Sequence, residues 1–354
     1  MKKVKLLIIT QKVDLNDDNL GFFHGWLEKF SEKLDKLYVI CLAQGDHNLP
    51  SNVSVYSLGK EKGASKISQL ICLQKNLAQI LPKVDGVFVH MCSIYAIASF
   101  PLVRIFNKNM VLWHTHKSID WKLKLAEKYV NKILTASKES CRLKNRKKIE
   151  VVGHGVDVEF FKPGYSPDDV NWNTALENKK FNILIAGRIA PIKDHETLIR
   201  AVDVLVNQKN IQDVKVNIVG SSLEDYEKEY FKKLNNLIQE KKLENYINFL
   251  GGVPYNKMPK HYQNSDLVVN LTSTGSFDKV LLETMASGCL VLTCNMVLAD
   301  ILSDKYLFKK KDFQELAEKI IALKEIGRTD KLRKIVIKHY NLDNLIEKIV
   351  KYFV

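Results

Sequence analysis

The sequence lacks both long apolar runs and closely paired cysteines. No stretch approaches the roughly 20 consecutive apolar residues that span a bilayer, so we expect no membrane span. The six cysteines are scattered, most of them within apolar segments: Cys41, Cys72, Cys92, Cys141, Cys289 and Cys294. None shows the CxxC spacing typical of zinc or redox sites. We therefore expect reduced core cysteines in a cytoplasmic protein, and no metal.

Acidic residues are also fewer than basic ones, 40 Asp and Glu against 54 Lys and Arg, which gives a formal net charge of +14. This excess favours an acidic partner, such as nucleotide phosphates, anionic lipid headgroups or nucleic acid. Many of the lysines lie along predicted helices, so solvation of outer helix faces is the alternative. Basic motifs interleaved with aromatic residues are missing, and we predict no nucleic-acid partner.

Glycine and proline are sparse, 16 and 8 in 354 residues, and 46% of the chain is hydrophobic. This composition is typical of a soluble globular protein, and the length favours two domains of about 150–200 residues. The start, MKKVKLLIITQKVD, resembles a signal peptide only superficially, because its apolar core Leu6–Ile9 is shorter than the usual 7–15 residues. We interpret it as a first strand.

Short apolar strands alternate with helical patterns in both halves of the chain. The predicted strands are Lys5–Thr10, Tyr38–Leu42, Val53–Leu58, Val87–His90, Met110–His114, Ile133–Ala136, Asn182–Ala186, Lys215–Val219, Tyr246–Leu250, Asp266–Leu271 and Leu290–Thr293. The predicted helices are Leu20–Leu34, Ser65–Leu81, Ser93–Phe106, Asp120–Val130, Ile192–Asn207, Leu223–Lys241, Lys257–Gln263 and Lys279–Ala286, followed by two short helical segments, the last being Leu342–Phe353. This alternation predicts an α/β fold of two doubly wound parallel sheets.

The helix Ser65–Leu81 is expected to be amphipathic, with one apolar face: Ile67, Leu70, Ile71, Leu77, Ala78 and Leu81. Periodicity stops between Phe161 and Lys180, where Pro, Gly, Ser, Asp and Asn predict a linker. We therefore place an acceptor-side domain at 1–165 and a donor-side domain at 166–336. Residues 337–354 are a C-terminal helix able to pack back on the first domain.

In open parallel sheets, ligands bind beyond the carboxyl ends of the strands. Gly187, Arg188 and Lys193 follow the strand Asn182–Ala186. The glycine permits close approach of a ligand, and the two cations can hold two phosphates from one loop. The alternative is two cations on an exposed loop.

Thr272–Gly288, TSTGSFDKVLLETMASG, follows another predicted strand and carries Glu283 within a helix. A carboxylate there suits hydroxyl groups, and the helix N-terminus favours a phosphate; a helix with an incidental glutamate is the alternative. Gly220-Ser221-Ser222 and Gly251-Gly252-Val253-Pro254 offer bare backbone to a base or ribose, or serve only as turns.

In the first half, His90 ends one strand and Trp113-His114-Thr115-His116 ends another. Such histidines can donate to a substrate hydroxyl or transfer a proton, and we prefer His116. His114 and His116 are expected on the same side if the strand continues. The loop Asn16–Gly25 follows the first strand. It is expected to cover a bound phosphate or acceptor, and a plain surface loop is the alternative.

Three segments carry a family resemblance: FNILIAGRIAPIKDHETLIRAV (181–202), HGVDVEFFKP (154–163) and 264–288. They resemble the GT-B glycosyltransferases, specifically the large retaining family 4. The resemblance implies the GT-B architecture, two Rossmann-like domains facing a cleft. It covers most of the second half. In the first half it rests on strand order, Gly21 and the strand-end histidines.

The resemblance also implies roles for individual residues. Arg188 and Lys193, beside Gly187, resemble the pair that holds the donor diphosphate. Glu283 resembles the ribose-binding glutamate, and His116 resembles the histidine that contacts the transferred sugar. The remaining implied contacts are backbone amides near sugar and phosphate, the nucleobase position, and the glycine loop of the first domain: Ser276 and Phe277, Val253, and Gly21. No metal or cofactor is implied, because Arg, Lys and a helix N-terminus stabilise the charge.

The sequence departs from the family pattern where the first of two glutamates is expected, because Gly275 stands there. Asp278 also stands where the family has a glycine, and Lys279 follows it. Either Asp278 is expected to contact a sugar hydroxyl, or Lys279 a phosphate. The segment Asn295–Ile301 lacks the family's paired glycines and glutamate. These departures concern the identity of the donor sugar.

The resulting hypothesis is a retaining glycosyltransferase that moves a sugar from a nucleoside-diphosphate-sugar to a glycan or lipid-linked acceptor, in surface polysaccharide or glycolipid synthesis. The basic composition suits a peripheral position at the inner face of an anionic membrane. The main alternative, favoured by Gly275, is a catalytically inactive nucleotide-sugar-binding subunit.

Overall fold

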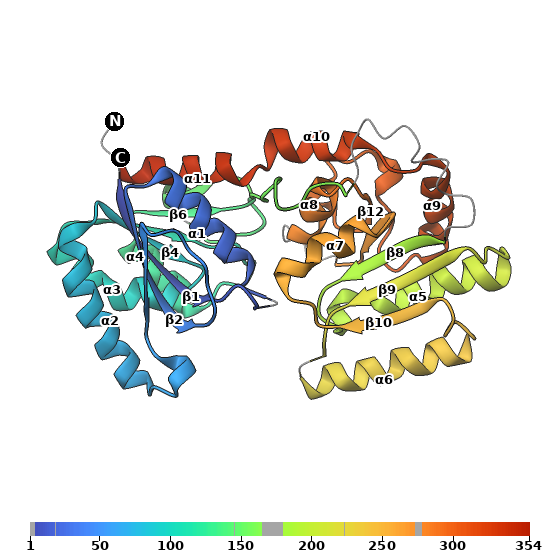
Figure 1. The fold of residues 1–354 in the computed structure, drawn as a ribbon, viewed down its shortest axis with the longest axis horizontal. Coiled ribbons are helices and arrows are strands. Elements are labelled where there is room, and N and C mark those ends of the chain that lie inside the picture. Colours follow the sequence, from blue (N-terminus) through green and yellow to red (C-terminus); the bar gives the residue numbers. More distant parts are fainter. Residues whose placement is uncertain (1–3, 18, 145, 165–179, 223, 273–277) are drawn as a thin grey trace. The chain divides into compact units, whose positions relative to one another are not determined.

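The computed structural model describes residues 4–17, 19–144, 146–164, 180–222, 224–272 and 278–354. The chain divides into two compact units. Unit 1 comprises Met1–Gly155, Pro254–Asn256 and Asn341–Val354, and unit 2 comprises Val156–Val253 and Lys257–Tyr340. Each unit is an α/β domain on one parallel sheet, so the predicted fold class is confirmed (Figure 1).

Unit 1 contains a seven-stranded sheet of order β3-β2-β1-β4-β5-β6-β7. Its strands are β1 (Lys5–Val13), β2 (Lys36–Gln44), β3 (Val53–Ser57), β4 (Gly86–His90), β5 (Asn109–Trp113), β6 (Lys132–Thr135) and β7 (Ile149–Val151). Every pairing is parallel. The central strands are apolar on both faces, because helices cover both sides of the sheet.

Two apolar cores flank this sheet. One lies under α2 (Lys66–Ile80), α3 (Ser93–Ile105) and α4 (Trp121–Tyr129). The other lies under α1 (Phe22–Lys33) and the C-terminal α11 (Leu342–Val350). α11 supplies Leu345, Ile346 and Ile349 to this second core, and Phe353 follows them. The last segment of the chain is therefore part of unit 1.

Unit 2 contains a five-stranded parallel sheet of order β10-β9-β8-β11-β12. Its strands are β8 (Phe181–Ala186), β9 (Val214–Val219), β10 (Ile247–Gly251), β11 (Leu267–Asn270) and β12 (Leu290–Thr293). Its helices are α5 (His195–Asp203), α6 (Asp225–Glu240), α7 (Met258–Gln263), α8 (Lys279–Ala286), α9 (Phe313–Ile326) and α10 (Asp330–His339). α5 packs against α6 and α9, and α8 packs against α10.

Polar side chains fix where several helices begin. Ser65 accepts a hydrogen bond from the Ser68 amide at α2, and Asp120 accepts one from the Leu123 amide at α4. Such caps satisfy amide groups that the helix leaves unpaired, and each stabilises it by about 1 kcal/mol. Asp278 caps α8 in the same way, which makes this predicted site residue also a structural one.

The predicted apolar face of α2 is wrong in its N-terminal half. Ile67, Leu70 and Ile71 are 74%, 49% and 65% exposed. Ala78 is exposed as well, whereas Leu77 and Leu81 are buried as predicted. Leu73 and Ile80, which the prediction did not include, are also buried. Helical spacing identified a real apolar stripe, but the sheet and α3 cover only part of the helix.

Other differences are smaller. The three-residue strand β7 was not predicted, and two helices, α9 and α10, stand where one short segment was expected before the last. The predicted last segment, Leu342–Phe353, is α11 together with the 3-10 turn Lys351–Phe353. The predicted helix Ile192–Asn207 is divided: a 3-10 turn precedes α5, and a π turn, Val204–Gln208, follows it. The order of strands and helices in the structure is otherwise the α/β alternation that the sequence predicts.

Candidate functional site

In unit 2 the strand order changes direction between β8 and β11, and ligands of open α/β sheets bind at this switch point. The loops after β8, β9 and β10 lie side by side there. The Gly187 amide donates to the Val219 carbonyl at 2.9 Å, and the Gly220 amide donates to the Gly251 carbonyl at 2.8 Å. The glycine turns identified in the sequence are therefore neighbours at one edge.

At two of these positions the backbone has a positive φ and a close neighbour, so glycine is favoured. Gly187 has φ +138°, and a β-carbon there would lie 3.4 Å from the Lys193 ammonium nitrogen. Gly220 has φ +149°, and its β-carbon would lie 1.9 Å from the Gly187 carbonyl oxygen. The close approach at Gly187 thus brings Lys193 over the end of β8.

Lys193 meets the start of α8 at this edge. Its ammonium lies 3.5 Å from an Asp278 carboxylate oxygen, and Asn270, the last residue of β11, donates to the same oxygen at 2.8 Å. The other Asp278 oxygen accepts from the Val280 amide. Burial pushes the Asp278 pKa up, but the Lys193 charge and these hydrogen bonds together hold it below its ordinary value.

Arg188 is held by a different acid. Its guanidinium donates to Glu227 at 3.2 Å, and Glu227 is fully buried at the start of α6, where it also forms a capping box with Glu224. Each of the two cations predicted to hold a diphosphate is therefore oriented by one carboxylate. Two ordered cations on adjacent turns of one loop can bind two phosphate groups.

Glu283 lies on α8 and is 4% exposed. The Tyr262 hydroxyl donates to its carboxylate at 3.0 Å. Lys279, one turn earlier, is half-buried. Burial lowers the pKa of Lys279 to about 8, because the attraction of Glu283 and Asp278 offsets only part of the desolvation.

Several predicted residues are not brought together with this cluster by any described contact. Ser276 and Phe277 lie outside the described residues, as does Gly275. Val253 is half-buried in the turn after β10. Their predicted contacts with sugar, phosphate and base stay predictions, as do the roles of Arg188, Lys193 and Glu283.

The predicted residues of unit 1 lie at its own sheet edge. β5 ends at Trp113, so His114 and His116 do not share a strand face: His114 is buried and His116 is exposed. The His116 ring nitrogen Nδ1 accepts from the Ser118 amide at 3.1 Å. Desolvation lowers the pKa of His114, which keeps that ring neutral at pH 7.

At the switch point of unit 1, between β1 and β4, two polar side chains pair: His90, which the sequence analysis identified, and Thr10, which it did not. Thr10 hydrogen-bonds the His90 ring at 3.2 Å, and that ring stacks on Phe23 with centroids 3.9 Å apart. Gly21 precedes α1, and a β-carbon there would lie 2.4 Å from the Asp17 carbonyl oxygen. Gly21 therefore has a structural reason to be glycine, whatever it binds.

Sequence reasoning missed Asn270, Glu227 and His195. Asn270 carried a usable signal, since it is a polar residue at the end of an apolar strand. Glu227 carried none, because its pairing with Arg188 depends on β8 lying beside β9. His195 begins α5 and is buried, and neither ring nitrogen has a hydrogen-bond partner among the described residues; desolvation lowers its pKa to about 4.

Within the described residues, no group of three or more His, Cys, Asp or Glu side chains is placed to hold a metal ion. Nor does any helix of that part of the chain combine the length and apolar character that crossing a bilayer requires. None of the six cysteines forms a disulfide within the described residues.

Sequence comparison connects this edge to a family. Residues 168–341 match the family described as Glycosyl transferases group 1. Residues 168–341 are a glycosyl transferases group 1 domain. The switch point of unit 2, with Arg188, Lys193 and Glu283, lies within it. A D-inositol 3-phosphate glycosyltransferase from Arthrobacter sp. (strain FB24) is 28% identical over 142 residues, 40% of this chain and 32% of the relative. The chain thus matches about a third of that protein's length.

Solved structures resemble the whole chain. Anabaena Alr3699/HepE in complex with UDP has a TM-score of 0.75 at 19% identity, over 98% of both chains. A glycosyltransferase from Rickettsia africae ESF-5 has a TM-score of 0.73 at 17% identity, over 100% of this chain and 98% of that one. Together with the group 1 domain, these structures confirm the predicted GT-B fold.

Proposed function

We propose that this protein is a retaining glycosyltransferase that transfers a sugar from a nucleoside-diphosphate-sugar to an acceptor hydroxyl. The observation that carries the proposal is the pair of cations at the switch point of a group 1 domain, Arg188 and Lys193, each oriented by a carboxylate. That UDP occupies the similar Anabaena structure supports a nucleotide donor.

In the proposed mechanism the donor diphosphate lies against Arg188 and Lys193. As the bond from the sugar to the diphosphate breaks, negative charge grows on the departing phosphate, and the two fixed cations stabilise it. The acceptor hydroxyl attacks from the same face of the sugar and gives its proton to the departing phosphate oxygen. Glu283 binds ribose hydroxyls, and His116 contacts the transferred sugar. The reaction is metal-independent in this scheme, since Arg and Lys supply the positive charge.

The donor site predicts which ligands stabilise the protein. UDP, GDP or ADP at a hundred times its Kd raises the free energy of unfolding by about 2.7 kcal/mol. We expect one of the three to raise the melting temperature, and Glu283→Gln to reduce that rise while retaining the acceptor for the Tyr262 hydroxyl. A chain that none of the nucleotides or their sugars stabilises would contradict the donor site.

The alternative, an inactive nucleotide-sugar-binding subunit, rests on Gly275 at the position of the first family glutamate. Release of free nucleoside diphosphate from a stabilising nucleotide sugar separates the two. Binding without release, with a lipid-linked or glycan acceptor present, would favour the subunit.

A second surface supports peripheral contact with an anionic membrane. Ile67, Leu70 and Ile71 form an exposed stripe on α2, and Ile94 and Trp121 are exposed at the starts of α3 and α4. α2 and α3 are neighbours, as are α3 and α4, and each of these residues lies near the N-terminal end of its helix. Trp and aliphatic residues of this kind insert at the bilayer interface.

Charge favours an anionic lipid as the occupant of this surface. The exposed lysines Lys60, Lys62 and Lys66 precede or begin α2. The acid between them, Glu61, accepts a hydrogen bond from the Ser57 hydroxyl. Each lysine close to an anionic membrane contributes about 1 kcal/mol of attraction. We therefore place the protein, in this proposal, at the inner face of a membrane, where a lipid-linked acceptor is found.

The test is flotation with vesicles of phosphatidylglycerol and phosphatidylcholine. The double variant Ile67→Asp, Ile71→Asp is expected to lower the bound fraction at least about tenfold, because two inserted side chains are lost. Ile105→Asp is the matched control: this isoleucine is 73% exposed at the other end of α3. Equal losses in both variants would contradict a membrane contact at this surface.

A further inference from the structure

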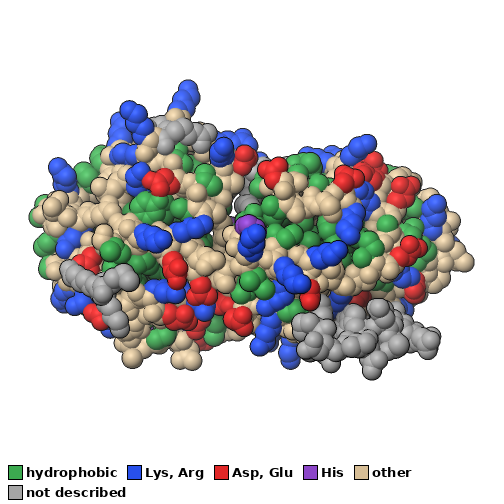
Figure 2. All heavy atoms as spheres, turned by 90° about the horizontal axis from the view of Figure 1, so that it is seen from above, with side chains coloured by type: hydrophobic (Ala, Val, Ile, Leu, Met, Phe, Trp, Pro, Cys, Tyr) green, Lys and Arg blue, Asp and Glu red, His purple; other side chains and the backbone are tan. Residues whose placement is uncertain are grey.

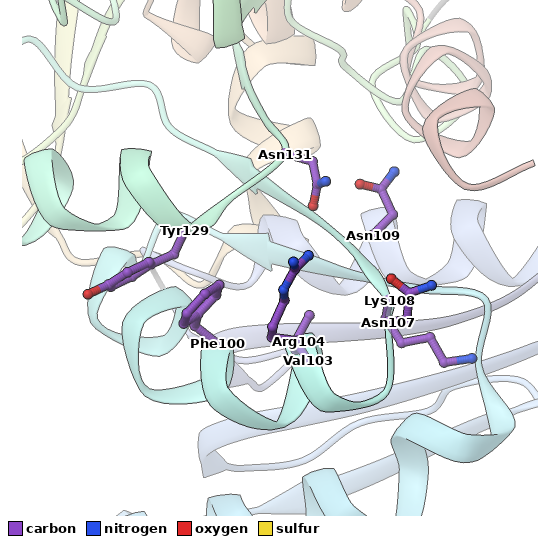
Figure 3. Close-up of a pocket in the computed structure, with 8 residues that line it drawn as sticks. All are labelled: Phe100, Val103, Arg104, Asn107, Lys108, Asn109, Tyr129 and Asn131. Carbon is purple, nitrogen blue, oxygen red and sulfur yellow. The ribbon is translucent and has the colours of Figure 1, made fainter.

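A cavity of about 270 Å³ opens in unit 1, away from the predicted site residues of that unit (Figure 3). It lies where α3 and α4 end and where β5 and β6 begin. The carboxyl ends of these strands, where His114 and His116 follow β5, are at the opposite edge of the sheet. No predicted site residue lines it.

The two helix ends beside the cavity are already satisfied by the chain. α3 ends with Asn107 in the left-handed conformation, φ +50°, and the Asn107 and Lys108 amides bind the carbonyls of Arg104 and Val103. At the end of α4, the Lys148 ammonium donates to three carbonyls at 2.8, 3.2 and 2.9 Å. These carbonyls at the two helix ends therefore have hydrogen-bond partners other than the side chains of Arg104 and Lys108.

Hydrogen-bond donors in the cavity exceed acceptors. Arg104 and Lys108 line it, and neither side chain has a hydrogen bond or ion pair with any residue that the structure describes. Asn131 uses its side-chain oxygen to accept from the Met110 amide at 2.9 Å, which leaves its two N–H donors. No acidic residue is among those that line the cavity.

One wall of the cavity is aromatic. Phe100 and Tyr129 stack with ring centroids 4.3 Å apart and 17° between the planes. Figure 3 shows the Arg104 side chain rising between this stack and Asn131. A planar guanidinium together with the two Asn131 N–H donors matches the oxygens of a phosphate or carboxylate, and Lys108 adds positive charge to the lining. The volume is below the range of about 300–1,000 Å³ that holds drug-sized ligands, so the ligand is small.

We propose that this cavity is a second binding site, which takes a small anionic molecule through a phosphate or carboxylate group held by Arg104, Lys108 and the Asn131 amide. The rest of the ligand lies against the stacked rings of Phe100 and Tyr129. The proposal does not depend on glycosyl transfer, because no residue is shared with the donor site.

Isothermal titration calorimetry of the full chain with inorganic phosphate and with glycerol phosphate tests the site, at constant ionic strength and with glycerol as the neutral comparison. We expect both anions to bind and glycerol not to. Arg104→Ala weakens binding about tenfold or more, because a charged hydrogen-bonding pair is lost. Arg104→Lys retains the charge and weakens binding less. A small dicarboxylate such as malonate shows whether carboxylates are accepted as well.

Phosphate also suits the donor site, so Arg188→Ala is measured in parallel. Binding that survives Arg188→Ala and fails in Arg104→Ala supports the cavity. Binding lost in Arg188→Ala but retained in Arg104→Ala overturns it, as does the absence of any binding. Lys124→Ala is the matched control, an exposed cation on α4 that does not line the cavity, and it is expected to bind as the unchanged chain does. Circular dichroism verifies that each variant is folded.

Discussion

Replacing Lys193 or Arg188 by alanine is expected to lower kcat by about 100-fold to 1,000-fold, the usual effect of removing one fixed charge-stabilising group from an active site. The loss should fall on kcat more than on KM, because the phosphate charge that these cations stabilise develops only as the sugar departs. If both cations hold one diphosphate, the double variant should lose less than the product of the two single losses. Initial rates of nucleoside diphosphate release measure all three.

Arg200 is the matched control for Arg188. It is also an arginine of unit 2 paired with one glutamate, Glu196 at 2.8 Å, but it lies in the last turn of α5. Arg200→Ala should change kcat less than twofold, as is usual for a residue outside the site. Turnover unchanged in both Arg188→Ala and Lys193→Ala would show that the diphosphate binds elsewhere.

Gly220→Ala is expected to destabilise unit 2 by about 3 kcal/mol, from overpacking together with backbone strain. The new β-carbon would lie 1.9 Å from the Gly187 carbonyl oxygen, and backbone atoms on both sides leave little room to yield. The turn after β9 would have to separate from the turn after β8, which carries Arg188. We expect the melting temperature to fall by about 6–12 °C.

Gly25→Ala is the opposite case in the same chain. Gly25 lies inside α1, and nothing lies within 4 Å of the position its β-carbon would take. Alanine there should be neutral or stabilise by about 0.5–1 kcal/mol, since glycine disfavours a helix interior. The melting temperatures of the two variants compare a position where neighbouring backbone atoms exclude a side chain, Gly220, with one where a side chain has room, Gly25. Equal melting temperatures would contradict the close approach at Gly220.

The alternation of apolar strands and helices was enough to predict both parallel sheets, because a buried strand and an amphipathic helix differ in period. Strand ends then located Gly187, Arg188 and Lys193 at an edge where ligands bind. The charge excess was less informative. Figure 2 shows Lys and Arg side chains spread over the face in view and interspersed with Asp and Glu, so net charge alone identifies no partner.

The sequence could not predict what depends on neighbours far along the chain. Glu227 pairs with Arg188 only because β9 lies beside β8. Ile67 and Ile71 fit a buried stripe by spacing, yet what covers a helix is set by the sheet below it. The contacts of Asp278 with Asn270 and Lys193 likewise depend on the folded edge, which brings β11 and the loop after β8 to the start of α8. The predicted contact of Asp278 with a sugar hydroxyl stays a prediction.

The C-terminal segment has a consequence for the order of folding. The Phe353 ring packs so closely on Gly86 that a β-carbon at position 86 would lie 2.4 Å from it. The Asn109 side chain donates to the Tyr352 carbonyl at 2.6 Å. These two partners begin β4 and β5, strands that a ribosome makes long before it reaches α11. Unit 1 is therefore first in synthesis but last in completion. Until residues 342–353 have left the ribosome, α1 alone covers that face of its sheet and the part under α11 stays exposed. The strands of unit 2 have all been made earlier.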